Sequence, residues 1–338
     1  MLATLTSPAI VEPGASQRQE THFVRSADDL RRALRAARER RLVLDTSALN
    51  RMLRLDGERN RLELQAATPW RAIAGYLGER AAELDAGLRT AGLPESVGEA
   101  VSANAAGPDG TPMVSHVEAI ALVTPDGELR RVDRESNMNL FRLAVGGHGL
   151  FGVLYSVTLR IDSLLRAAQR AQAPVELDLT GTAIAGGVSR TAEVLVPPEK
   201  LDRALSDFRG LAAERRVTLQ KVLVRRLRPE DETFLRWAGR EWAGLTIDFC
   251  TRPTLGASVH AAEIHRLLLE IALSHGGSFP VAEASIAPLA QIHACYPTIS
   301  AFVAQKRRFD AAERMQNRWY RRVAALLRDQ SHPSAENE

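Results

Sequence analysis

The stretch that decides the fold is SHVEAIALVTPDGELRRVDRESNMNLFRLAVGGHGLFGVLYSVTLRI, residues 115–161. Two strand-like runs, HVEAIALVT and ELRRV, are separated by Pro125-Asp126-Gly127. This tripeptide signals a turn because proline presets φ and glycine accepts a positive φ. We therefore expect a β-hairpin, followed by a short helix near residues 139–143. The last part begins rich in glycine and ends as an alternating strand, VLYSVTLRI, residues 153–161.

Helix and strand signals continue on both sides of this stretch. Ser26 and Asp29 form a capping-box-like pair at the start of a helical pattern that reaches residue 40. The other upstream elements expected are strands at 42–45 and 61–66 and a helix at 69–83. The downstream elements expected are strands at 192–196, 217–226 and 246–250 and helices at 199–214 and 257–275. This order predicts an α+β fold with helices on one face of an antiparallel sheet.

Composition argues against several classes of protein. The 338 residues are 45% hydrophobic and 25% charged, which suits a folded globular chain. The formal charge is only +3 and no dense basic stripe with aromatics is present, so we expect no nucleic-acid partner. Cys250 and Cys295 stand far apart, and the histidines lack ligand spacing, so neither a disulfide framework nor a metal site is expected. No apolar run approaches the ~20 residues of a membrane span, and residues 1–20 lack the signal-peptide pattern, so we expect a cytoplasmic protein.

Two glycine-rich segments are the strongest candidates for a binding site. They are SVGEAVSANAAG, residues 96–107, and VGGHGLFGV, residues 145–153. Glycine permits positive φ and close approach of amides to a phosphate, and successive N–H groups in such turns can hold an anion. The alternative is that these glycines only make tight turns between strands. The candidate binding residues are Ser96, Val97, Gly98, Ser102, Asn104, Gly107, Gly146, Gly147, Gly149, Gly152 and Val153.

In this order, the two segments and the hairpin between them resemble the second half of the FAD-binding domain of FAD-linked oxidases, the vanillyl-alcohol oxidase class. The family pattern has a Ser-x-Gly-Gly segment ending in Asn-x-His-Gly, a hairpin with an Asp-Gly-Glu turn, and a Gly-Gly-x-Gly-x-Phe-Gly segment. A second stretch, HACYPTISAFVAQKRRFDAAERMQNRWY, residues 293–320, resembles the C-terminal signature of the aldonolactone-oxidase and decaprenylphosphoryl-ribose-oxidase branch. Together the resemblance extends over residues 24–320.

The resemblance implies an α+β fold made of a PCMH-type FAD-binding domain and a smaller substrate (cap) domain with an antiparallel sheet. It implies a shortened FAD-binding domain at 21–162 and a cap domain at 163–285, and we expect residues 1–20 to form a flexible arm. The segment 286–330 would pack back on the FAD-binding domain. FAD would be held non-covalently and would oxidise the CH–OH group of a small alcohol, sugar or lactone-type substrate.

The chain also departs from the family pattern. The glycine-rich pyrophosphate loop, whose histidine carries covalent flavin in some members, has no counterpart where Arg40-Arg41 run directly into LVLDTSALN. Glu99 replaces the family's second glycine, and Ala106 replaces its histidine. A carboxylate about 4 Å from a diphosphate costs on the order of 4 kcal/mol at an effective dielectric of about 20, which is roughly 10³ in affinity.

Two interpretations therefore remain open. One is a shortened FAD-dependent oxidoreductase. The other is a degenerate, non-catalytic relative that serves as a binding or scaffold subunit, with weak or no FAD binding. A partner protein that completes the shortened site is compatible with the resemblance as well.

The C-terminal signature supplies two candidate catalytic residues, Lys306 and Tyr320. Lys306 would recognise an anion near the reactive face of the flavin; the favoured alternative is a solvated helix face with an i,i+4 pair to Asp310. Tyr320 would serve as an acid or base, or else only pack against the FAD-binding domain. His148, inside the second glycine segment, would contact flavin or substrate, or else only occupy a turn.

Overall fold

The computed structural model describes residues 21–36, 43–78, 84, 86–88, 92–177 and 186–331. The expected arm at 1–20 and the Arg40-Arg41 junction lie outside these residues. Contacts divide the chain into two compact units. The first holds the described residues up to Ala171, with Glu232–Leu235 and Ser300–Arg321. The second holds the described residues of Gln172–Asp231 and Arg236–Ile299, and those from Arg322 onward.

This division differs from the expected boundaries in three places. It falls after Ala171 rather than at residue 162, because helix α6, Ile161–Gln169, buries Leu164 and Ala167 within the first unit. The short segment Glu232–Leu235 joins the first unit although it lies between two strands of the second. Of the expected C-terminal segment 286–330, only Ser300–Arg321 belongs to the first unit.

The first unit begins with a β-α-β arrangement. Strands β1, Thr21–Phe23, and β2, Val43–Asp45, pair in parallel, and helix α1, Ala27–Ala36, lies between them in the sequence. The Ser26 hydroxyl accepts the Asp29 amide at 3.1 Å, and the Asp29 carboxylate accepts the Arg25 amide at 3.0 Å. This confirms the predicted N-terminal cap of the helix.

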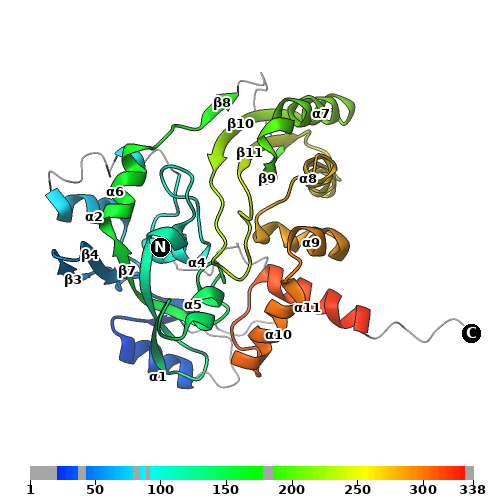
Figure 1. Ribbon diagram of the computed structural model, residues 1–338. Coiled ribbons are helices and arrows are strands. Elements are labelled where there is room, and N and C mark those ends of the chain that lie inside the picture. Colours follow the sequence, from blue (N-terminus) through cyan, green and yellow to red (C-terminus); the bar gives the residue numbers. More distant parts are fainter. Residues whose placement is uncertain are drawn as a thin grey trace, which may run out of the picture. The chain divides into compact units, whose positions relative to one another are not determined.

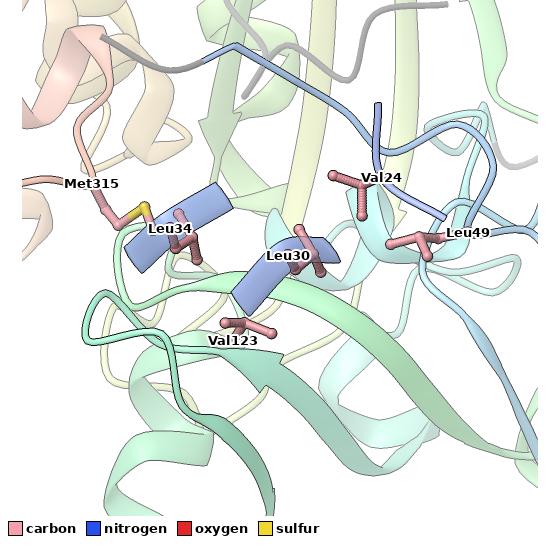
Figure 2. Close-up of a cluster of buried hydrophobic side chains, with 6 residues drawn as sticks. All are labelled: Val24, Leu30, Leu34, Leu49, Val123 and Met315. Atoms are coloured by element: carbon pink, nitrogen blue, oxygen red, sulfur yellow. The ribbon is translucent and has the colours of Figure 1, made fainter. Parts of the chain in front are cut away.

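Figure 2 shows the hydrophobic core that holds α1 in the first unit. Leu30 and Leu34 on α1 pack with Val123, and Met315 lies beside Leu34. The guanidinium group of Arg314 donates to the carbonyls of Leu34 and Pro125. The C-terminal part of the chain therefore helps to fix α1 against the predicted hairpin. The remaining members of this core are Val24 and Leu49.

A five-stranded antiparallel sheet in the order β3-β4-β7-β5-β6 forms the rest of the first unit's described sheet structure. Leu62 and Leu64 are fully buried, as the alternation at 61–66 predicts. Gly127 has φ +81° in the predicted hairpin turn. The strands are β3 Met52–Asp56, β4 Arg61–Gln65, β5 Val117–Val123, β6 Leu129–Asp133 and β7 Val153–Arg160. The helices are α2 Trp70–Leu77, α4 Val97–Ser102, η2 Met113–His116 and α5 Met138–Ala144.

The second unit has a four-stranded antiparallel sheet in the order β8-β10-β11-β9. Helices α7 and α8 pack on one face of it, as the α+β pattern predicts (Figure 1). Alternate residues such as Val194 and Ile247 are fully buried. The strands are β8 Val175–Leu177, β9 Val188–Val196, β10 Thr218–Leu227 and β11 Trp242–Thr251. The helices are η3 Pro198–Lys200, α7 Leu201–Glu214, α8 Ala257–Ser274, η4 Val281–Ser285 and α9 Leu289–Cys295.

Two helices close the described chain, α10, Ile299–Phe309, and α11, Arg318–Ser331. In the first unit, Phe302 of α10 lies 5.3 Å from Phe151 and 6.0 Å from Trp319, between ring centroids. Through Phe151, these rings pack against the second glycine-rich segment. No helix within the described residues is long and apolar enough to cross a membrane.

Candidate functional site

Helix α4 begins in the first glycine-rich segment, and its start explains Glu99. The Ser96 hydroxyl accepts the Glu99 amide at 3.3 Å, and the Glu99 carboxylate accepts the Ser96 amide at 3.4 Å. This is a capping box. The carboxylate folds back on the first turn of its own helix, so Glu99 has a structural role as a cap. The Ser-x-x-Glu spacing signals this cap in the sequence.

The glycine of this segment is needed for packing. A Cβ on Gly98 would lie 2.7 Å from the carbonyl oxygen of Ala66, and the Gly98 amide donates to the same oxygen at 2.7 Å. The Val97 amide donates to the Thr68 carbonyl at 3.1 Å. Both amides are therefore occupied by protein carbonyls.

The end of the segment folds over itself. Asn104 is fully buried with φ +46°, and its side-chain oxygen accepts the Val114 amide at 2.9 Å. The Gly107 amide donates to the Thr111 carbonyl at 2.7 Å. A Cβ on Gly107 would lie 3.0 Å from the Thr111 carbonyl oxygen and 3.1 Å from Nε2 of His116, so a larger residue would fit tightly here.

The structure brings the two glycine-rich segments together. The Gly146 amide donates to the Val101 carbonyl at 3.1 Å, and the His148 amide donates to the Ser102 carbonyl at 2.9 Å. Gly146, His148 and Gly149 all have positive φ. Segments about 45 residues apart in the sequence thus form one double turn at the C-terminal end of α4.

Backbone amides of the second segment donate hydrogen bonds to nearby carbonyls and so stabilise this double turn. The Gly147 amide donates to the Ala144 carbonyl at 3.1 Å, and the Gly152 amide donates to the Gly149 carbonyl at 3.4 Å. Gly152 has φ +147°, and a Cβ there would lie 2.5 Å from the Val123 carbonyl oxygen. Val153 begins β7 and is paired with Val123. Amides bonded in this way hold the backbone in shape and leave side chains to contact a ligand.

His148 and Trp319 lie next to each other at the double turn. Their rings meet edge to face with centroids 6.0 Å apart, and the Asn317 amide group donates to the His148 carbonyl at 3.4 Å. Burial lowers the pKa of His148 to about 4, so its ring is neutral at pH 7. The indole N–H of Trp319 is buried and finds no acceptor among the described residues. A buried donor of this kind fits a ligand rich in acceptors, such as a flavin.

Lys306 does not lie on a solvated helix face. Its side chain is fully buried, and its ammonium group pairs with Asp310, which is 3% exposed. The expected i,i+4 pair is present, but the expected solvation is wrong, because α10 turns this face into the core of the first unit. Burial lowers the pKa of Lys306, and Asp310 opposes that shift.

Tyr320 is also buried and engaged. Its hydroxyl donates to the Glu313 carboxylate, and its ring lies 5.4 Å from the Lys306 ammonium. Burial and the carboxylate of Glu313 raise the pKa of Tyr320 far above its ordinary value. A tyrosine held in this way keeps its proton at neutral pH, so it is a poor general base.

The second unit contains a charged cluster that sequence reasoning did not find. The Glu283 carboxylate accepts the Glu193 amide at 3.2 Å and lies 3.0 Å from Nε2 of His265. Desolvation and the neighbouring Glu283 raise the pKa of Glu193, while Arg225 opposes the shift. Glu193 lies on the sheet face opposite α8, since its neighbours Ala192 and Val194 are buried. These residues are far apart in the sequence, so no motif signals them.

Known proteins resemble the chain at two levels. Residues 32–133 match the family described as FAD binding domain. No curated protein matches the chain in sequence. The solved structure of an alkyldihydroxyacetonephosphate synthase matches with a TM-score of 0.56 and 10% identity, over 87% of this chain and 75% of that one. This second likeness shows the fold alone.

The chain therefore has an α+β fold that contains an FAD-binding domain of the PCMH type. The matched domain supports FAD as the cofactor, as the sequence predicts. At the double turn, the buried indole N–H of Trp319 is a donor without a partner among the described residues, which suits a ligand rich in acceptors such as FAD. The assignment to the aldonolactone-oxidase branch stays a prediction.

Proposed function

We propose that the protein is an FAD-dependent oxidoreductase that acts on the CH–OH group of a small alcohol, sugar or lactone-type substrate. The observation that carries the proposal is the double turn, built from two segments of an FAD-binding pattern, beside the neutral His148 and the buried indole N–H of Trp319. FAD, when bound, accepts a hydride from the substrate carbon. We propose that the candidate residues from Ser96 to Val153 shape its non-covalent site, in a cytoplasmic protein.

FAD should be retained by the purified protein and released by acid precipitation, because the proposed site is non-covalent. A Ser102→Trp variant should lose FAD, since Ser102 is partly exposed at the double turn. A Ser136→Trp variant is the matched control, because Ser136 is exposed in a loop of the same unit. Visible absorbance of the flavin and circular dichroism of the fold are the measurements. A well-folded protein that stays colourless at high micromolar FAD would contradict the proposal.

In the FAD-loaded protein, at least one substrate from a panel of small alcohols, sugars and lactones should reduce the bound flavin under anaerobic conditions.

The competing candidate is a non-catalytic binding or scaffold protein. The amides of Gly98, Gly146 and Gly152 donate to protein carbonyls, and the parallel sheet β1-β2 consists of two three-residue strands. A panel in which no substrate reduces the FAD-loaded protein would favour this candidate. Stoichiometric co-purification of a second chain that restores FAD binding would favour a site completed by a partner.

A further inference from the structure

Strand β3 forms one edge of the five-stranded sheet (Figure 1). Within the described residues it pairs with β4 on one side only. Leu53 is 43% exposed and Leu55 is 46% exposed. An edge strand presents a row of main-chain donors and acceptors, and exposed apolar side chains make it a template for another strand.

The opposite edge of the same sheet is protected. On β6, Arg130 pairs with Asp126, and Arg131 pairs with Glu63. Both arginines of β6 are therefore engaged within the chain, so they are less available to a second copy than an arginine without an ion pair.

The sequence of β3 is complementary to itself. An antiparallel pair centred on Leu55 places Arg54 of each copy opposite Asp56 of the other, on one face of the extended sheet. Arg54 is exposed and forms no ion pair with a described residue, and Asp56 uses one carboxylate oxygen to accept the Arg59 amide at 3.0 Å. A register centred on Arg54 would instead oppose two arginines. Charge therefore favours the register centred on Leu55 over the one centred on Arg54.

We propose that two copies of the protein associate through β3, antiparallel and centred on Leu55, to form one continuous sheet. The strand is five residues long and has an irregularity between Met52 and Arg54, which limits the length of the pairing. The contact is thus a small one, and we expect a weak dimer in rapid exchange with the monomer. This association is independent of FAD and of catalysis.

A charge-exchange experiment tests the register. In Arg54→Asp, the substituted residue faces Asp56 of the other copy; in Asp56→Lys, it faces Arg54. Each variant alone should dimerise at least about tenfold more weakly than the wild type, because two attractive pairs become repulsive. An equimolar mixture should form a heterodimer with affinity near the wild-type value, since both pairs are then complementary. Sedimentation velocity over a concentration series measures the three cases.

Two further variants keep the test decisive. Leu55→Glu places two carboxylates at the centre of the contact and should give a monomer, even if Asp56→Lys fails to fold after losing its bond to the Arg59 amide. Leu129→Glu, on β6, should leave the dimer unchanged. A wild-type protein that stays monomeric at several hundred micromolar, or a mixture that stays monomeric while the wild type dimerises, would overturn the proposal.

Discussion

Replacing Asp310 with alanine should lower the free energy of unfolding by about 3–5 kcal/mol. The Lys306 side chain is fully buried and its ammonium group pairs with Asp310, which also accepts the Met315 amide at 2.8 Å. Removal of the carboxylate leaves a buried charge without its counterion, which costs far more than the loss of an exposed pair. Urea unfolding at pH 7 measures the difference.

The double variant Lys306→Met/Asp310→Leu should recover most of this loss, because apolar residues of similar size replace the whole buried pair. Arg130→Ala is the surface control, since its pair with Asp126 is exposed and should contribute about 1 kcal/mol or less. If Asp310→Ala costs no more than Arg130→Ala, the Lys306 ammonium is not held in the core as described.

Acid should weaken the fold through His116 by about 3 kcal/mol as the pH falls from 6.5 to about 4. His116 is 2% exposed, its Nδ1 lies 2.8 Å from the Ser163 hydroxyl, and its Nε2 is buried without a partner among the described residues. Burial lowers its pKa from 6.5 to about 4. His116 therefore becomes protonated below pH 6.5 in the unfolded chain, but only near pH 4 in the folded chain. The stabilisation is present above pH 6.5 and is lost as the pH falls.

A His116→Gln variant should be less stable than the wild type at pH 7 but should depend less steeply on pH between 6.5 and 4. His22→Gln, at a partly exposed position, controls for the loss of one histidine. Urea unfolding at a series of pH values gives the change in unfolding free energy with pH for the wild type and for each variant. A variant whose slope equals that of the wild type would show that His116 does not resist protonation.

Local signals predicted much of the fold. The Ser26–Asp29 cap, the Pro125-Asp126-Gly127 hairpin and the buried alternation of β4 depend on residues close in the sequence, and the structure confirms them. The pairing of the two glycine-rich segments also agrees with their order in the family pattern.

Other features depend on tertiary contacts and could not be predicted in this way. The i,i+4 spacing of Lys306 and Asp310 fixes their contact but does not say whether the helix face is solvated or buried. Glu193, Glu283 and His265 come from three separate elements, β9, η4 and α8. Their contacts depend on how these elements pack, and the spacing of residues along the sequence does not predict this. Glu99 is different. The Ser-x-x-Glu spacing of its capping box is a local signal, but comparison with the family pattern shows only that Glu99 stands where the family has a glycine.

The contact between Met315 and α1 has a consequence for the order of events at the ribosome. The core that contains Val24 and Leu30 near the start of the chain is completed by Met315, and Arg314 binds the carbonyl of Leu34. Because synthesis proceeds from the N-terminus, Arg314 can reach the Leu34 carbonyl only after a further 280 residues have been made. The β-α-β arrangement of β1, α1 and β2 therefore gains its last packing contacts long after its own residues have been synthesised.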